Sequence, residues 1–444
     1  MSKRPQDTSA EEPNGGNLHV RLRRGPGRGN RPALLNSRRC VSSTISLRAL
    51  ACLIAGMAVQ LAPSRATHAE GQSGTNDSRL GFVVSHFRMA LSRAASETGA
   101  CPRGMTLGPA QIFAATPEGQ RREGENDANY SSRMERGALS VIFRNGKSLC
   151  NNPESGGPDP SFHTVTGRNA PAEGIDLDGQ VSHVGGPAAP GTCPHDDFRG
   201  MNGEEGIDNQ FFRLVGCSNA YQPTGNVGGL DTSMYAGEWG ILITLRGVDD
   251  LTNDADVEVG IYASADPIQL SPTREPLTYA TYAADQDPRF RAVTHGRIVH
   301  GVLTTDPVSV RFHYVVNGMF LERPLDRARL RMTIKADKTL DGILAGYTPL
   351  DAMYDMSYGF RNATDETGKP ANERLRVGSA VGASRVLGHT CNGAYYAMQE
   401  LADGDRDPKT GRCSSISTQY RVQAIPAFVV DAPVSHGSAA PGGR

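Results

Sequence analysis

Residues 308–321 read VSVRFHYVVNGMFL, and this stretch decides the fold class. Apolar side chains stand at every second position from its first residue to Val316, which is the period of a β-strand with one buried face. Asn317-Gly318 follows directly and is the strongest short signal for a hairpin turn. The residues after this turn begin a return strand. The stretch therefore predicts an antiparallel β-hairpin.

The same alternation recurs on both sides of this hairpin. Apolar residues alternate with polar ones in residues 239–245, 257–261 and 330–334. Each such strand has one apolar face to bury, and antiparallel sheets packed face to face bury it. We therefore expect a mainly β protein with an antiparallel β-sandwich or jelly-roll core. Residues 416–430 should supply one or two closing strands, broken at Pro426.

Two helices are expected outside this core. Residues 77–96 carry apolar side chains at helical spacing on one face, and Gly99 lies just past their end. Residues 392–402 also have a helical pattern, which Gly404 can end. These features predict a small N-terminal helix-containing segment and a mixed C-terminal segment around the β core.

Changes in composition divide the chain into six expected segments. They are a disordered basic extension (1–36), a signal peptide (37–69), a loop-rich region with the N-terminal helix (70–172), the β-sandwich core with acidic loops (173–347), a mixed region that completes the sheet (348–432) and a disordered tail (433–444). The segment after the signal peptide is long enough for two or three domains at ~150 residues each.

The signal peptide is predicted from residues 49–62, ALACLIAGMAVQLA, which carry no charge. Arginines precede this run and small residues ending at Ala69 follow it, as in a secretory signal. Its length falls short of the ~20 residues that a membrane helix needs. We expect a periplasmic or secreted protein that is cleaved near Ala69. General secretion is favoured, and a partial twin-arginine match at Arg38-Arg39 is the alternative.

Removal of the signal makes the protein acidic. The full chain has a formal net charge of −1, and residues 1–69 hold 11 of its 46 basic and 3 of its 47 acidic residues, so −9 remains. An acidic chain argues against binding to the phosphates of nucleic acid. It is compatible with cation binding at local acidic clusters.

Six cysteines follow the signal, and an oxidising compartment favours disulfides between them. Six cysteines allow 15 pairings. We expect neighbours along the chain to pair, because each bridge then closes a local loop. No CxxC or CxxH spacing favours a zinc site. The expected disulfide cysteines are Cys101, Cys150, Cys193, Cys217, Cys391 and Cys413.

Three acidic clusters are candidate calcium sites, because carboxylates at alternate positions of a tight loop can converge on one ion. The first lies in ADGDRDPKTGRC (402–413), the second in VDDLTNDADVEVG (248–260), and the third in HDDFRGMNGEEGIDN (195–209), near DLDG at 176–179. The candidate ligands are Asp403, Asp405 and Asp407 in the first cluster, Asp250, Asp254 and Asp256 in the second, and Asp196, Asp197 and Asp208 in the third.

Each cluster has an alternative interpretation. The first is not an EF-hand, since Pro408 and Ser414 stand where that loop needs Gly and Glu. Solvated polar turns are the more ordinary explanation of the first two clusters. His183 and His195 flank the third, so a mixed histidine and carboxylate site for Zn²⁺ or another transition metal is a further alternative there.

The sequence contains none of the familiar catalytic motifs, such as HExxH, a Walker loop, GxGxxG or G-x-S-x-G. We therefore expect an exported, disulfide-stabilised, non-catalytic protein. Its loops would hold structural calcium, and its surface would bind an envelope component, a glycan or another protein. The alternative is a secreted hydrolase with a metal or two carboxylates in the loop region 176–209. No nucleic-acid partner and no transmembrane span are expected.

Overall fold

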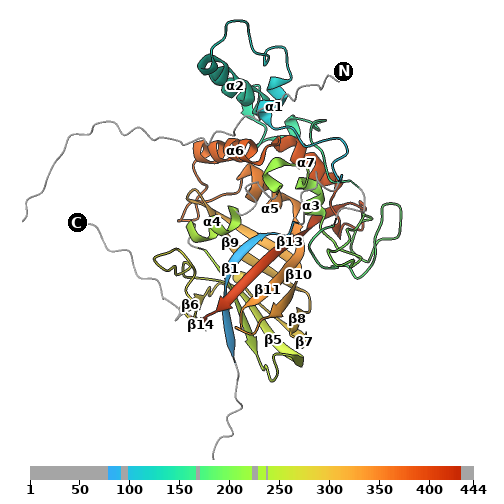
Figure 1. Ribbon diagram of the computed structural model, residues 1–444, viewed down its shortest axis with the longest axis vertical. Helices are drawn as coiled ribbons and strands as arrows, with labels where there is room; N and C mark the ends of the chain where they lie inside the picture. Colours follow the sequence, from blue (N-terminus) through green and yellow to red (C-terminus); the bar gives the residue numbers. More distant parts are fainter. Residues whose placement is uncertain (1–78, 92–98, 167–170, 223–228, 237–238, 432–444) are drawn as a thin grey trace, which may run out of the picture. The chain divides into compact units, whose positions relative to one another are not determined.

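The hairpin expected at residues 308–321 is present in the computed structural model (Figure 1). β9 (Val308–Val316) pairs with β10 (Met319–Ile334), and Val316 lies opposite Met319. Asn317 and Gly318 have φ angles of 52° and 71°, the positive values that a two-residue hairpin turn needs. The structure describes residues 79–91, 99–166, 171–222, 229–236 and 239–431. The expected basic extension, signal peptide and C-terminal tail lie outside these residues.

The mainly β class is confirmed by one sheet of 10 strands, in which every pairing is antiparallel. Besides β9 and β10 it contains β1 (Leu80–Met89), β4 (Ile241–Arg246), β5 (Asn253–Ala263), β7 (Arg291–Val299), β8 (Val302–Thr305), β11 (Leu340–Pro349), β12 (Gly404–Arg406) and β13 (Cys413–Pro426). Its strands come from the N-terminal region, the central region and the C-terminal region of the chain.

The sheet closes on itself through β1. One edge of this strand pairs with β4 and the other with β13, so Phe82 lies opposite Ile243 on one side and Pro426 on the other. The strands β1, β4, β5, β7, β8, β10, β11 and β13 thus form a ring. The expected β-sandwich or jelly-roll core is not confirmed, because the described pairings join these strands in one closed sheet. Alternating apolar residues require one buried face, and the inside of a closed sheet meets that requirement as well as a second sheet does.

Aromatic side chains pack where the ring closes. Phe87 of β1 stacks on Tyr420 of β13 with ring centroids 4.5 Å apart. Trp239 meets Phe87 edge-on at 6.1 Å, and all three side chains are buried. Stacked and edge-to-face contacts of this kind stabilise a core beyond simple area burial. They fix β1 against β13.

The helix expected at residues 77–96 is wrong over the described part, because residues 80–89 form strand β1. Residues 82–85 are all buried, so both faces of the strand are covered there, whereas His86 and Arg88 are exposed. The covered stretch has no polar face, and the apolar positions of the strand also fit a helical period by chance. Valine and phenylalanine favour extended backbone, and pairing on both edges decides the outcome.

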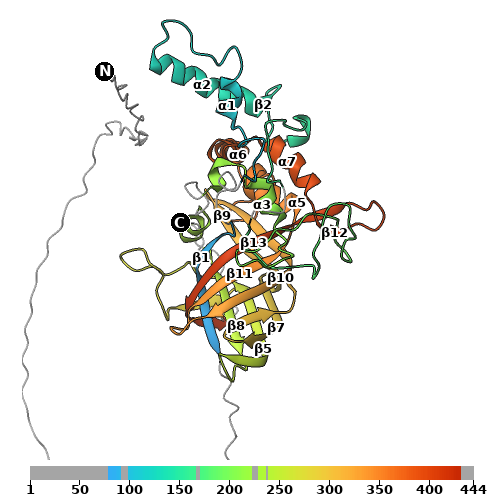
Figure 2. The same cartoon turned by 45° about the vertical axis from the view of Figure 1, so that its right-hand side comes forward.

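Helices gather at one end of the closed sheet, where Figures 1 and 2 both show α3, α5, α6 and α7 together. The helix expected at 392–402 is confirmed as α7, which begins after Thr390. The helices are α1 (Pro109–Ala114), α2 (Asp127–Ile142), α3 (Gln210–Val215), α4 (Gly229–Ala236), α5 (Leu350–Tyr354), α6 (Glu373–Leu387) and α7 (Cys391–Glu400).

Short elements complete the description. They are the strands β2 (Phe143–Arg144), β3 (Lys147–Ser148), β6 (Thr281–Ala284) and β14 (Phe428–Asp431), the 3₁₀ turns Pro153–Ser155, Asn219–Tyr221 and Pro288–Phe290, and a π-turn at Asp355–Gly359. β13 and β14 are the two strands expected around Pro426. Within the described ranges, no helix has both the length and the apolar character needed to span a bilayer.

All six expected cysteines form disulfides, but the expected pairing of neighbours is wrong. The bridges are Cys101–Cys217, Cys150–Cys391 and Cys193–Cys413, with sequence separations of 116, 241 and 220 residues. The expectation assumed short local loops. In the folded protein, segments that are distant in sequence lie side by side. Each disulfide joins two such segments.

Candidate metal centre

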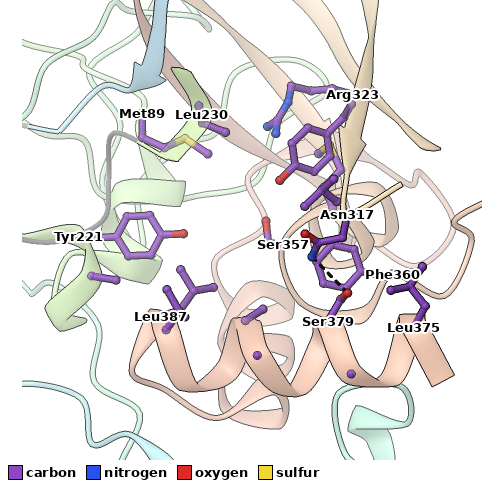
Figure 3. A pocket seen from close by; sticks show the side chains of 18 of the residues that line it. Met89, Tyr221, Leu230, Asn317, Arg323, Ser357, Phe360, Leu375, Ser379 and Leu387 are labelled. Atoms are coloured by element: carbon purple, nitrogen blue, oxygen red, sulfur yellow. Dashed lines mark hydrogen bonds between the residues drawn. The ribbon is translucent and has the colours of Figure 1, made fainter. Parts of the chain in front are cut away.

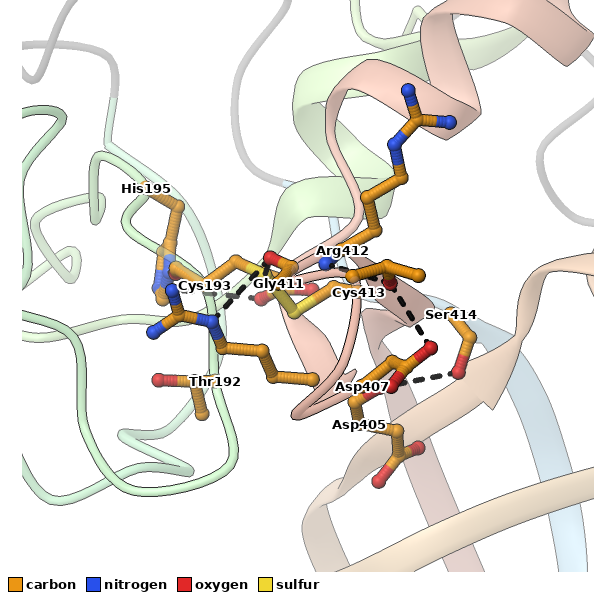
Figure 4. Close-up of a disulfide and its surroundings, with 12 residues drawn as sticks. Thr192, Cys193, His195, Asp405, Asp407, Gly411, Arg412, Cys413 and Ser414 are labelled. Atoms are coloured by element: carbon orange, nitrogen blue, oxygen red, sulfur yellow. Dashed lines mark hydrogen bonds and ion pairs between the residues drawn. A yellow bond between two sulfur atoms is a disulfide. The ribbon is translucent and has the colours of Figure 1, made fainter.

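The loop at residues 176–209 is attached to the start of β13 by the Cys193–Cys413 disulfide (Figure 4). Backbone contacts reinforce this attachment. Cys193 N–H donates to the carbonyl oxygen of Asp403 at 2.9 Å, and Thr192 and Gly404 form an isolated antiparallel β-bridge. A segment near the middle of the chain is thus fixed beside a residue more than 200 positions later. This contact assembles the candidate site.

The imidazole of His195 lies at the centre of the site and is buried. Its Nδ1–H donates to the carbonyl oxygen of Cys193 at 2.7 Å. Its Nε2 lies 2.7 Å from Asp208 Oδ1 and 3.1 Å from Asp197 Oδ1. Asp403 Oδ2 lies 4.0 Å from the same nitrogen. Three carboxylates therefore face one ring nitrogen.

Each carboxylate is oriented by backbone N–H groups on its other oxygen. Asp208 Oδ2 accepts from Leu177 at 2.6 Å, Asp403 Oδ1 accepts from Ser417 at 2.7 Å, and Asp197 Oδ2 accepts from Ser182. Asp403 Oδ2 is buried and accepts no hydrogen bond within the described residues. Backbone donors hold a carboxylate in one orientation, so the inward oxygens are preorganised.

Asp178 lies at the edge of this group and is half-buried. Ligand atoms of Asp178, His195 and Asp208 all lie within 4.8 Å of one another, a separation that one metal ion can bridge. We refer below to Asp178, His195, Asp197, Asp208 and Asp403 as the His195 cluster.

Burial and mutual charge perturb the titration of the cluster. Burial alone disfavours the imidazolium, but hydrogen bonds to Asp197 and Asp208 outweigh it and raise the pKa of His195 to about 11. Burial raises the pKa of Asp208 to about 7 and that of Asp403 to about 6. The protein thus holds several carboxylates where ionisation is costly unless a cation is present.

The first acidic cluster is divided between this centre and the surface. Asp403 belongs to the His195 cluster, whereas Asp405 forms an ion pair with Arg327 at 3.2 Å. Asp407 accepts hydrogen bonds from Lys409 N–H at 2.7 Å and from the hydroxyl of Thr410 at 3.0 Å, as in a polar turn. The expectation that Asp403, Asp405 and Asp407 share one ion is therefore wrong.

The second acidic cluster does not converge. Asp250 accepts from Thr252 N–H, and Asp254 accepts from Asp249 and Asp256 N–H, which is the pattern of Asx turns. The carboxylate of Asp256 instead lies 2.7 Å from Nδ1 of His295 on the neighbouring strand. Each of the three carboxylates in this loop thus interacts with a different group, and they do not point toward one common position.

The third acidic cluster contributes most of the centre. Asp197 and Asp208 are in it, while the carboxylate of Asp196 accepts from Val184 N–H at 2.9 Å. His183 is exposed and lies outside the cluster. Sequence reasoning missed the role of Asp178 and the pairing of this loop with Asp403. The DLDG motif at 176–179 was a signal for Asp178. No feature of the sequence indicated that this loop lies beside Asp403.

The geometry defines a disulfide-linked β protein with a buried cluster of one imidazole and several carboxylates. Comparisons with protein-family models, with curated proteins and with solved structures find no match for the chain.

Proposed function

We propose that this protein is an exported metal-binding protein in which the His195 cluster holds one divalent transition-metal ion. The ion ties the loop at residues 176–209 to the closed sheet. One observation carries the proposal: oxygens of Asp197, Asp208 and Asp403 converge on Nε2 of His195. Three disulfides and the signal-like segment before Ala69 support export.

The orientation of the imidazole is the one that a metal-binding histidine adopts. Donation from Nδ1 to a backbone carbonyl fixes the tautomer and leaves Nε2 as a metal-binding atom, which is the usual arrangement of a histidine ligand. An imidazolium at His195 and the buried guanidinium of Arg213, which interacts electrostatically with Asp197 and Asp403, would together supply two positive charges against three buried carboxylates. A doubly charged ion offsets more of that negative charge.

The donor set also bears on the type of ion. Calcium takes oxygen ligands, whereas imidazole nitrogen suits Zn²⁺ and other first-row transition metals. His195 presents its nitrogen at the point where the carboxylates meet. We therefore propose Zn²⁺ or Mn²⁺ in place of the calcium expected from the acidic spacing.

Burial favours a structural role over catalysis. His195, Asp197, Asp208 and Asp403 are each at most 5% exposed. A catalytic metal needs an open position for water or substrate, whereas a structural metal is enclosed by the protein. Only Asp178 is half-buried among the five residues, so the secreted-hydrolase alternative has less support.

Metal analysis combined with thermal unfolding tests the proposal. The exported, disulfide-bonded protein should contain about one equivalent of Zn²⁺ or Mn²⁺ by mass spectrometry after dialysis. Chelator should lower its melting temperature, and either ion should restore it, because an ion at 100 times its Kd adds about 2.7 kcal/mol of stability. Asp208→Asn should abolish the response, and Asp254→Asn is the matched control that should retain it.

Two results would contradict the proposal. One is a chelated protein whose melting temperature does not respond to Zn²⁺ or Mn²⁺. The other is an equal response to Ca²⁺ that Asp208→Asn leaves unchanged. Metal-dependent hydrolysis of ester or glycan substrates, lost in Asp208→Asn, would instead establish the hydrolase alternative.

A further inference from the structure

We propose that the pocket between β10 and α6 binds a single-chain carboxylate of the fatty-acid type, with Arg323 paired to the carboxylate. The pocket has a volume of about 630 Å³ and lies at the helix-covered end of the closed sheet. It shares no residue with the His195 cluster, so the two proposals stand on separate observations. A cavity of this size suits a small amphiphilic ligand.

Apolar groups make most of the pocket wall (Figure 3). They come from the end of β1, from the 3₁₀ turn Asn219–Tyr221, from α4, from β9, from the π-turn after α5 and its following residue, and from one face of α6. The apolar lining side chains are Met89, Ala220, Leu230, Val316, Met356, Phe360, Leu375, Ala383, Val386 and Leu387. Such a wall favours an alkyl chain over a sugar or a nucleotide, because its apolar groups outweigh the polar side chains, which include Tyr221, Asn317, Ser357, Arg374 and Ser379.

Arg323 is the buried cation of this pocket, with 3% of its surface exposed. One Nη atom donates to the hydroxyl of Tyr420 at 2.9 Å, whereas its Nε–H has no hydrogen-bond partner within the described residues. The guanidinium lies 4.6 Å from the ring centroid of Tyr314 and 5.5 Å from that of Tyr420. These rings stabilise a cation but do not neutralise it.

The charge of Arg323 therefore calls for an anion. Burying a cation without a counter-ion is costly, and in the described part of the chain no ion pair joins Arg323 to a carboxylate. The adjacent Glu322 instead pairs with Arg289 and Arg311. A ligand carboxylate can accept from the unpartnered Nε–H and form a charge-assisted pair. One buried cation matches one negative charge.

The opposite wall of the pocket leaves room for the alkyl chain. Gly378 and Gly382 lie four positions apart on α6 and line the pocket. A Cβ added at either position would meet no atom within 4 Å. Glycine destabilises a helix interior by about 1 kcal/mol relative to alanine. The two glycines therefore lower the stability of α6 but leave the pocket wider at this wall.

Trp239 provides the readout for a binding experiment. It is the single tryptophan of the chain, and its ring lies 6.0 Å from that of Tyr314, which lines the pocket. Laurate is added to the exported, disulfide-bonded protein while Trp239 fluorescence and heat of binding are recorded. We expect saturable binding of one laurate, and binding of lauryl alcohol that is weaker by about tenfold or more.

Variants separate the proposed pair from nonspecific uptake. Arg323→Met should weaken laurate binding by about tenfold and leave lauryl alcohol unaffected. Arg311→Met on the neighbouring strand is the matched control and should bind laurate like the wild type. Gly382→Leu fills the opposite wall without touching Arg323, so it should weaken both ligands while the protein stays folded. Asp208→Asn should bind laurate normally, because its cluster is separate.

Several outcomes would overturn the proposal. They are the absence of laurate binding, equal affinity for laurate and lauryl alcohol, and wild-type laurate affinity in folded Arg323→Met. If Arg323→Met does not fold, wild-type affinity in Gly382→Leu decides against the pocket. Any of these results would leave Arg323 as a structural cation within its ring of aromatic side chains.

Discussion

The Nε2 atom of His195 lies 2.7 Å from Oδ1 of Asp208, and these residues are joined by a loop whose start is fixed by the Cys193–Cys413 disulfide. The loop cannot leave the sheet without separating His195 from Asp403, whose Oδ2 lies 4.0 Å from the same nitrogen. Because Asp403 precedes β12 and faces the same nitrogen, the contact also couples the loop to the C-terminal strands. The His195 cluster thus connects two segments that are distant in sequence, the loop at residues 176–209 and the region around Asp403.

Asp403→Asn tests whether the cluster extends to the C-terminal strands. The amide keeps the shape of the side chain but removes its charge beside His195, so Zn²⁺ affinity should fall by about tenfold or more in calorimetric titration. Asp405→Asn is the matched control two positions away, where the carboxylate pairs with Arg327 outside the cluster. Equal affinities in the two variants would remove Asp403 from the site.

The Cys193–Cys413 bridge should contribute to metal affinity as well as to stability. Replacing both cysteines by serine frees the loop that carries His195, so Zn²⁺ binding should weaken and about 2–5 kcal/mol of stability should be lost. The double replacement at Cys150 and Cys391 removes a bridge elsewhere and should cost stability alone. Titrations that show the same affinity in both double variants would contradict this coupling.

Buried His389 should make the protein sensitive to acid. Burial lowers the pKa of its imidazole to about 3, and its Nε2 has no hydrogen-bond partner within the described residues. The folded form therefore keeps His389 neutral while the unfolded chain binds a proton below its ordinary pKa of about 6.5. The resulting stability is present above that value and is lost as the pH falls towards 3, by about 2 kcal/mol at pH 5.

Urea unfolding at pH 7 and pH 5 measures this effect. The stability difference between the two pH values should be smaller by about 2 kcal/mol in His389→Gln than in the wild type. His183→Gln, at an exposed position, should keep the wild-type difference. An unchanged pH dependence in His389→Gln would show that this histidine does not couple protonation to folding.

Two glycines should respond oppositely to alanine. A Cβ at Gly404 would overlap the ring of Tyr347 and lie 2.5 Å from Ser415 Oγ, so Gly404→Ala should lose about 1–3 kcal/mol. Gly378 on α6 has open space around it, so Gly378→Ala should gain about 0.5–1 kcal/mol. Denaturant midpoints provide the comparison, and a stable Gly404→Ala protein would show that the ring can move aside.

Local signals predicted the strands well and the closure of the sheet poorly. The turn at Asn317-Gly318 needs only neighbouring residues, and the structure forms it as expected. β1 was misread because its partners Ile243 and Pro426 lie far along the chain. Period-two alternation reports that one face is buried, but it does not state whether a second sheet or the inside of a ring covers it.

Only the part of the candidate site that lies within one loop could be predicted, because sequence patterns report local neighbours. His195 and Asp208 share one acidic loop, whereas Asp403 reaches them only through the folded chain. The burial of Arg323 could have been predicted from strand alternation, although arginine is usually an exposed residue. Arg323 occupies the same strand face as Leu321 and Leu325, two positions away on either side, and alternation therefore directs it inward with these buried residues.

Anomalous diffraction from crystals grown with Zn²⁺ tests the central claim most directly. The account predicts one strong peak at the zinc edge, about 2.0–2.2 Å from His195 Nε2 and from an oxygen of Asp208. A map with no peak at the His195 cluster, while Nε2 keeps its 2.7 Å hydrogen bond to Asp208, would contradict the account and identify the cluster as a buried imidazolium among carboxylates.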